Sequence, residues 1–103
     1  MRKQKKEYLS TYLLQETKIS RLKTMSKINP ELKNLYEKEI DQALLLRQKI
    51  EKQILAVDGG ILSEVLFQKY IFGKTLEDIS YTLNYSSRHI ERLHIKALDE
   101  FKL

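Results

Sequence analysis

The sequence contains no cysteine and no tryptophan, one proline and three glycines. The absence of cysteine excludes disulfides and thiolate metal sites. The scarcity of glycine and proline leaves few places for tight turns, which favours a few long helices over a many-stranded fold. Apolar runs are short, as in Ala43-Leu44-Leu45-Leu46, and the start of the chain lacks the apolar core of a signal peptide. We therefore expect a cytoplasmic protein without a membrane segment.

Charge is unevenly distributed along the chain, although the net charge is only +5. Residues 1–30 carry eight Lys or Arg against two Asp or Glu, whereas residues 61–103 carry six of each kind. A basic run can bind phosphate groups, and it is equally typical of a solvated chain start. The length of 103 residues suits one domain, or one small domain with a helical extension.

The first half of the chain has the pattern of two amphipathic helices that are separated at Asn29-Pro30. Asn29 is expected to cap the second helix through its side chain, and proline is favoured at the first helical position. Because the turn is short, the two helices should form an antiparallel, coiled-coil-like hairpin over residues 1–58, with about 25 residues in each helix. The apolar stripes at helical spacing comprise Tyr8, Leu9, Tyr12, Leu13, Ile19 and Leu22, then Tyr36, Ile40, Ala43, Leu46, Ile50, Ile54 and Val57.

The length of this hairpin bears on its role. It exceeds what a small neighbouring domain can cover, so we expect it to form a homodimer or to bind a partner. Local packing against the rest of the chain is the alternative. The segment Asp58-Gly59-Gly60 should end the second helix, because paired glycines disfavour helix, and it marks the expected boundary with a second unit, residues 61–103.

Shorter helices are predicted in residues 61–103. The first runs from Leu62 to Phe72, and Gly73 is placed to cap its end. The second begins at Thr75, with Asp78 three residues further on in a pattern close to a capping box. Its buried face should consist of Leu76, Ile79 and Leu83, with the small Ser80 allowing a neighbouring helix to approach closely.

A sharp turn is predicted between the second and third of these helices. Asn84 tolerates the left-handed backbone that such a turn needs, and Tyr85 is expected to fill the turn. Ser86 should cap the third helix, about residues 86–101, whose first two turns are polar. This pattern predicts a helix-turn-helix in an all-α fold; an ordinary three-helix bundle with a polar surface is the alternative. The core face of the third helix comprises Ile90, Leu93, Ala97 and Leu98.

The segment "LSEVLFQKYIFGKTLEDISYTLNYSSRHIERLHIKALDEF" resembles region 4 of bacterial sigma factors. Within that superfamily it is most similar to phage regulators of the ArpU/RinA type, which are small activators of phage late or lysis genes. The shared features are "KYIFGKTLEDIS", the "NYS" turn and "RHIERLHIKAL". The resemblance implies a sigma region 4-like helix-turn-helix domain in a phage or prophage late-gene activator. It also implies double-stranded DNA and RNA polymerase as partners, in the cytoplasm of a bacterial host.

The sequence departs from that family in the helix after the turn. Sigma factors typically read Ser-Arg-Glu-Arg-Val-Arg-Gln there, whereas this chain reads "SSRHIER" from Ser86 to Arg92. The side chains that would face bases differ, so the sigma promoter element is not the expected target. A chain of 103 residues also has no room for the region that melts promoter DNA.

The residues expected to contact DNA lie near the start of the third helix, which enters the major groove in such motifs. Arginine can donate two hydrogen bonds to guanine, and glutamate can accept one from cytosine, so Arg88, Arg92 and Glu91 are candidates for base contacts. Solvated charges, with Glu91 as a local partner of the arginines, are the alternative. Phosphate contacts are expected from other members, including Ser86 as a capping serine. The predicted DNA-binding set is Ser86, Ser87, Arg88, His89, Glu91, Arg92, Lys96, Lys74 and Thr75.

The two histidines do not suggest a metal site. His89 and His94 are five residues apart and point in different directions on a helix, whereas metal pairs prefer spacings of three or four. Either could hydrogen-bond a phosphate or a base edge, although a surface or partly packed histidine is the more common outcome. The sequence contains no glycine-rich phosphate loop and no nucleophile with a matched base. We therefore expect no enzymatic activity, no cofactor and no metal.

Two other functions are open from the sequence. The domain could bind RNA polymerase and modify transcription without reading DNA, which the neutral charge of residues 61–103 favours. The chain could instead resemble a small terminase subunit, which also joins a helix-turn-helix to an oligomerising hairpin. In small terminase subunits the DNA-binding motif usually comes first, opposite to the order expected here.

Overall fold

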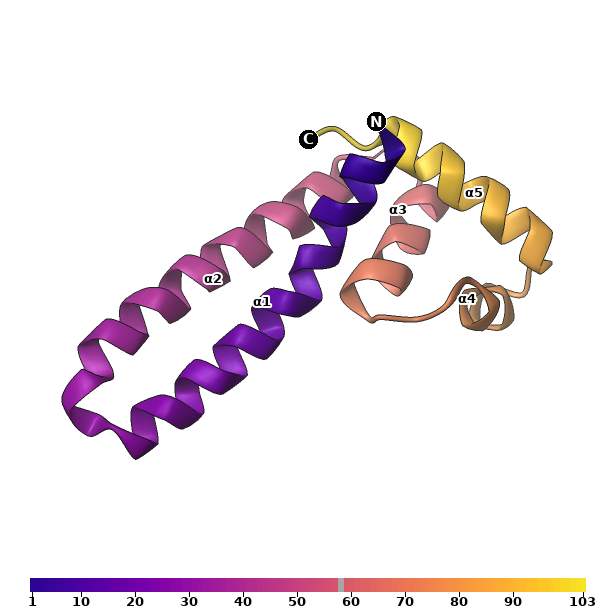
Figure 1. Cartoon of the computed structure of the whole chain (residues 1–103). Helices are drawn as coiled ribbons and strands as arrows, with labels where there is room; N and C mark the ends of the chain where they lie inside the picture. Colours follow the sequence, from indigo (N-terminus) through magenta and orange to yellow (C-terminus); the bar gives the residue numbers. More distant parts are fainter. Residues whose placement is uncertain (58) are drawn as a thin grey trace.

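The computed structural model describes residues 1–57 and 59–103, which form five α-helices (Figure 1). The two long helices, α1 and α2, run antiparallel, and the three shorter helices pack at one end of this hairpin. The predicted all-α fold with an N-terminal hairpin is therefore confirmed. The molecule measures 52 × 25 × 21 Å because the hairpin extends far beyond the shorter helices. The helices are α1 (Arg2–Ile28), α2 (Lys33–Leu55), α3 (Ile61–Leu66), α4 (Leu76–Leu83) and α5 (Ser87–Glu100).

The turn of the hairpin is a 3-10 helix, η1 (Pro30–Leu32), with proline at its first position. The predicted side-chain cap at Asn29 is wrong, because the Asn29 side chain makes no capping hydrogen bond. Backbone hydrogen bonds form the turn instead: the Asn29 N–H donates to the Met25 carbonyl at 2.8 Å at the end of α1, and the Leu32 N–H donates to the Asn29 carbonyl at 3.0 Å. Consequently α2 begins only at Lys33.

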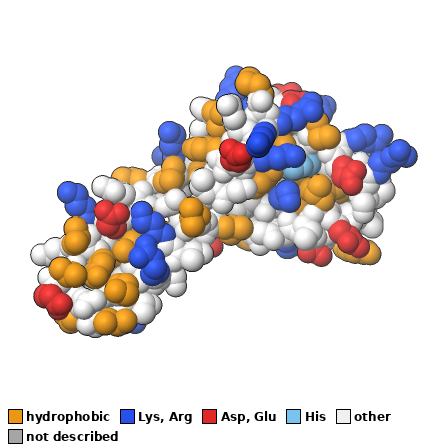
Figure 2. Space-filling view, viewed as in Figure 1, with side chains coloured by type: hydrophobic (Ala, Val, Ile, Leu, Met, Phe, Trp, Pro, Cys, Tyr) orange, Lys and Arg blue, Asp and Glu red, His pale blue; other side chains and the backbone are white. Residues whose placement is uncertain are grey.

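The seam of the hairpin follows the predicted apolar stripes. Leu13 is the main exception, because its side chain is partly exposed and its Cδ1 lies close to Gly73. Figure 2 also shows hydrophobic side chains on the surface at the free end of the hairpin. None of the helices in the described part of the chain is long and apolar enough to cross a membrane. The buried residues of the two long helices are Leu9, Tyr12, Ile19 and Leu22, with Ala43, Ile50 and Ile54.

The first short helix has two parts: α3 continues directly into a π-helical segment, η2 (Phe67–Ile71). Gly73, with φ of 70°, ends it as predicted, and the Lys74 N–H donates to the Gln68 carbonyl at 3.0 Å. A Cβ at Gly73 would lie 3.3 Å from Cδ1 of Leu13. Glycine at this position therefore also allows η2 to approach α1 closely.

The segment between the hairpin and α3 contains two glycines with positive φ, 79° at Gly59 and 22° at Gly60. These values agree with the prediction that the paired glycines interrupt the helix. The α2 helix ends at Leu55, shortly before them. Asp58, the first residue of the predicted boundary, lies outside the described residues.

Both α4 and α5 begin with the side-chain cap that the sequence predicts. The Thr75 hydroxyl accepts a hydrogen bond from the Asp78 N–H at 3.1 Å, and the Ser86 hydroxyl accepts one from the His89 N–H at 3.1 Å. Asn84 has the predicted left-handed conformation, with φ of 59° and ψ of 43°. The left-handed Asn84 and the capping Ser86 therefore specify the turn between α4 and α5 through short-range interactions.

Tyr85 does not fill this turn, contrary to the prediction. Its side chain is 44% exposed and packs edge-on against the ring of His89, with 4.9 Å between the ring centroids. Ser80 of α4 is buried, and its hydroxyl lies 3.5 Å from that of Ser87. The small side chain of Ser80 therefore lets the start of α5 approach α4 closely, as predicted.

The left-handed conformation of Asn84 makes its substitution informative. Asn84→Val is expected to lower the free energy of unfolding by about 1–2 kcal/mol, because a β-branched side chain clashes with the backbone at positive φ. Asn84→Gly is the matched control and should stay close to the wild type, since glycine adopts this conformation without strain. Urea denaturation measures both; equal losses in the two variants would show that the Asn84 side chain, rather than its backbone conformation, matters.

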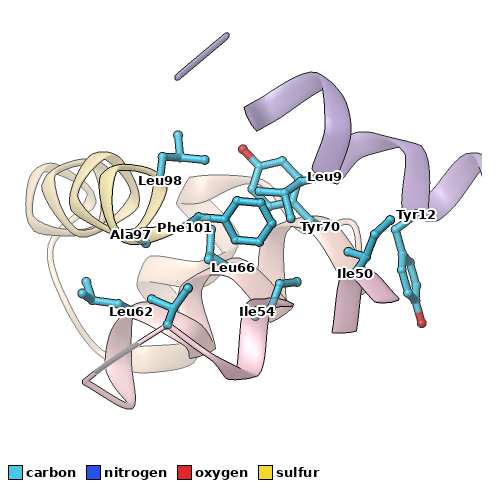
Figure 3. Packing of buried hydrophobic residues seen from close by; sticks show 11 residues of the cluster. Leu9, Tyr12, Ile50, Ile54, Leu62, Leu66, Tyr70, Ala97, Leu98 and Phe101 are labelled. Carbon is cyan, nitrogen blue, oxygen red and sulfur yellow. The ribbon is translucent and has the colours of Figure 1, made fainter. Parts of the chain in front are cut away.

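Buried side chains from the hairpin and from the shorter helices form one hydrophobic cluster (Figure 3). The ring of Phe101, which follows α5, lies in the middle of this cluster, among side chains from α1, α2 and α3. The cluster thereby fixes α3 and α5 relative to the hairpin, and α4 is held by its packing against α5 and η2. Its buried members are Leu9, Tyr12, Ile50, Ile54, Val57, Leu62, Leu66, Tyr70, Ala97, Leu98 and Phe101.

Candidate nucleic-acid interface

The C-terminal half of α5 is partly covered by the start of α1. The guanidinium of Arg2 donates to both carboxylate oxygens of Asp99, at 2.8 and 3.0 Å, and these hydrogen bonds, together with the charge of Arg2, lower the pKa of Asp99. Lys5 Nζ donates to the Leu98 carbonyl at 2.8 Å, where a positive charge complements the end of the helix dipole. Two members of the basic N-terminal run are thus occupied within the molecule. The N-terminal half of α5 is free of these contacts.

Arg88 and Arg92 lie on this free half of α5, and both are exposed. Because they are four residues apart, their side chains share one face of the helix. Among residues 1–57 and 59–103, neither arginine forms an ion pair, and Glu91 pairs with neither of them. The five N–H donors of each guanidinium are therefore available to an external acceptor. Because the guanidinium is planar, it binds best to a group that presents two acceptor atoms side by side in the same plane.

The other residues of α5 in the predicted set differ in how freely they are presented. Ser86 is exposed, but its hydroxyl is engaged in the helix cap, and the Ser87 hydroxyl faces Ser80 of α4. His89 is half-buried beside Tyr85. Glu91 and Lys96 are exposed, with Lys96 one turn beyond the arginine pair.

Two members of the predicted set, Lys74 and Thr75, lie away from α5 at the start of α4. The Thr75 hydroxyl is engaged in the cap of α4, and Lys74 Nζ lies 3.4 Å from the hydroxyl of Thr82. Because α4 packs against α5, the members near α4 and the members on α5 lie on one pair of contacting helices. The structure does not bring them together into a single cluster of side chains.

His94 is buried, with 5% of its surface exposed, so it is not presented to a ligand outside the molecule. Its Nε2 lies 2.7 Å from the hydroxyl of Tyr70. Burial lowers the pKa of His94 to about 4, and the charges of Lys69 and Lys6 add to this shift. Burial likewise raises the pKa of Tyr70 to about 12, so both groups are neutral near pH 7. The spacing of four residues from both Ile90 and Leu98 is the sequence signal for this burial.

The depressed pKa of His94 predicts a loss of stability in acid. Between pH 6.5 and about pH 4 the unfolded chain binds a proton at His94 and the folded chain does not, so stability falls as the pH is lowered through this range. The expected contribution is about 2 kcal/mol. Denaturation at several pH values measures it. His94→Gln, which can still accept from Tyr70, should lose this part of the dependence, and His89→Gln should retain it; equal behaviour of the two variants would contradict the assignment.

In the described residues, no group of three His, Cys, Asp or Glu side chains is arranged to hold a metal ion. Comparisons with protein-family models, with curated proteins and with solved structures find no match to this chain. The protein is therefore described by its own fold and surface. It is an all-α protein in which a long helical hairpin carries three shorter helices, with an exposed arginine pair on the last of them.

Proposed function

We propose that this protein is a sequence-specific DNA-binding transcriptional regulator, whose helix-turn-helix comprises α4, the turn at Asn84 and α5. The N-terminal half of α5 would enter the major groove, which is where recognition helices present their base-reading side chains. The observation that carries the proposal is the pair Arg88 and Arg92, exposed on that half without an ion-pair partner in the described part of the chain. The resemblance to sigma region 4 and to ArpU/RinA-type regulators supports a phage or prophage late-gene activator in a bacterial cytoplasm.

Rigidity of the presenting helix also supports this function. The cap at Ser86 and the packing of Ile90 fix the start of α5, and the contacts of Arg2 and Lys5 fix its end. A helix held at both ends presents its arginines with little freedom to lose on binding. The N-terminal half is the half left open, and it is the half that base reading requires.

Selection of bound duplexes from a random DNA library tests the proposal. The wild type is expected to enrich a defined sequence, and the Arg88→Ala/Arg92→Ala double variant is expected to lose that enrichment. The matched control is Arg21→Ala, which removes an exposed arginine from the hairpin and should enrich the same sequence. Absence of enrichment by the wild type would remove sequence-specific DNA binding.

Binding to RNA polymerase without DNA recognition is the second candidate function. The observation in its favour is the charge of residues 61–103, in which six Lys or Arg balance six Asp or Glu. A domain that binds DNA mainly through phosphates usually carries a basic excess. Co-purification with polymerase, combined with no shift of any duplex at low salt, would favour this candidate over the first.

We also propose that the hairpin forms a homodimer. Ile28, Leu32 and Leu35 are exposed around the hairpin turn, and Figure 2 shows hydrophobic side chains gathered over this end of the molecule. Exposed apolar groups of this kind gain stability when a second surface covers them. A dimer would pair two helix-turn-helix units, so its DNA target would contain two half-sites.

Sedimentation velocity tests the dimer. The Ile28→Glu/Leu35→Glu variant is expected to sediment as a monomer where the wild type sediments as a dimer, since two buried carboxylates would have to lose their hydration. Leu55→Glu, at the other end of the hairpin, is the matched control and should leave the dimer intact. A monomeric wild type would contradict dimerisation, and a ring of eight or more chains would favour a terminase-like role instead.

A further inference from the structure

A groove of about 320 Å³ lies where α1 meets η2 and the start of α4. Three lysines from three different segments line it: Lys6 of α1, Lys69 of η2 and Lys74 just before α4. Ser10 and Thr75 add hydroxyl groups. The described residues that line the groove include no carboxylate, so the charges that face it are all positive.

The three ammonium groups are not neutralised within the described part of the protein. None of them forms an ion pair among residues 1–57 and 59–103. Lys69 lies over the ring of Tyr70, with Nζ 5.8 Å from the ring centroid, and Lys74 Nζ makes a long hydrogen bond of 3.4 Å to the Thr82 hydroxyl. Like charges around one concave surface repel one another, and an anion between them offsets that repulsion.

The positive charge around the groove also lowers the pKa of the buried His94 nearby. His94 is bonded to Tyr70, whose side chain lines the groove, and both Lys69 and Lys6 help to lower its pKa. The two lysines therefore act on the same small region of the molecule, although they are 63 positions apart in the sequence (69 − 6). The arrangement exists only because the hairpin packs onto η2.

We propose that this groove binds a phosphate of the DNA backbone, beside the stretch of duplex that α5 would read. The inference rests on the proposed function and adds Lys6 and Lys69 to the interface. Lysine binds phosphate as a point charge and needs no fixed geometry, which suits three flexible side chains around an open groove. Figure 2 shows Lys and Arg side chains on one face, both where α1 meets the shorter helices and at the outer end of α5.

Salt dependence of DNA binding tests this inference, because each neutralised phosphate contributes about 0.9 to the slope of log K against log salt. The variant Lys6→Gln/Lys69→Gln is expected to have a slope shallower by up to roughly 0.9, the contribution of one phosphate, on the duplex that the wild type enriches. The control Lys23→Gln/Lys38→Gln removes the same charge from exposed positions in the outer half of the hairpin, and its slope should equal that of the wild type. Lys6→Gln alone, at an exposed position, should make the slope shallower by a smaller amount, because Lys69 and Lys74 remain at the groove.

The outcomes separate this inference from the proposed function. Equal slopes for the two double variants, with the enriched duplex still bound, would overturn the groove and leave the proposed function intact. If no sequence is enriched, the same titration on a random-sequence duplex decides: a shallower slope for Lys6→Gln/Lys69→Gln alone supports the groove, and equal slopes overturn it. Binding of inorganic phosphate that is lost in this variant, without any change of slope on DNA, would identify a site for free anions and overturn a DNA contact.

Discussion

Replacing Arg88 and Arg92 together by alanine is expected to weaken binding to the cognate duplex by about 2–6 kcal/mol. Each arginine that makes a bidentate contact with guanine contributes about 1–3 kcal/mol of discrimination, and the two side chains share one exposed face of α5. Fluorescence anisotropy with the enriched duplex at a fixed salt concentration measures the loss. Each single variant should lose its preference for guanine at a different base position, because the two arginines lie one helical turn apart.

The control for this prediction separates base reading from charge. Arg88→Lys/Arg92→Lys keeps both charges but removes the planar fork of donors, so it should lose specificity while retaining most of its binding to random DNA. Alanine variants that bind the cognate duplex as tightly as the wild type would show that these arginines are solvated charges. They would also shift the balance toward the polymerase-binding candidate.

Replacing Phe101 by alanine is expected to lower the free energy of unfolding by about 3–5 kcal/mol, the usual cost of removing a large aromatic side chain from a core. Phe101 is 1% exposed and lies among buried residues of both the hairpin and the shorter helices. Its ring also lies 6.2 Å from that of Tyr8, measured between centroids. Because the cluster is shared, loss of this ring should destabilise the whole chain in one transition.

Denaturant unfolding followed by circular dichroism and by tyrosine fluorescence measures this effect. Leu103→Ala, two residues away and largely exposed, is the matched control and should change stability by less than about 0.5 kcal/mol. Two separate transitions in the wild type would contradict a shared core. A loss below about 1 kcal/mol in Phe101→Ala would show that the cluster relaxes around the missing ring.

Local structure was predictable where a single residue has one dominant preference. The left-handed Asn84 and the caps at Thr75 and Ser86 follow from short-range chemistry, and all three are as expected. Local preference failed at two positions. The Asn29 side chain makes no cap, because the turn is closed by backbone hydrogen bonds, and Tyr85 is exposed and packs against His89 instead of filling the turn.

The candidate site was only partly visible in the sequence. The polar face at the start of α5 could be read from helical spacing, because the buried face is marked by Ile90 and Leu98. The sequence did not show which polar residues of α5 are free, because partners come from remote positions. Asp99 near the end of α5, for example, pairs with Arg2, 97 positions earlier. The same holds for the lysine groove, because Lys6 is remote in the sequence from Lys69 and Lys74 and meets them only in the folded chain.

By itself the sequence determined the helical class, the hairpin and the capped turn, because helix periodicity, capping and turn preferences act over a few residues. Only the tertiary structure decided how the hairpin and the shorter helices meet. That arrangement depends on the burial of Phe101 and its neighbours from four helices, and burial of apolar surface is non-directional and depends on the whole fold. It left Arg88 and Arg92 exposed, paired Arg2 with Asp99, and brought Lys6 beside Lys69.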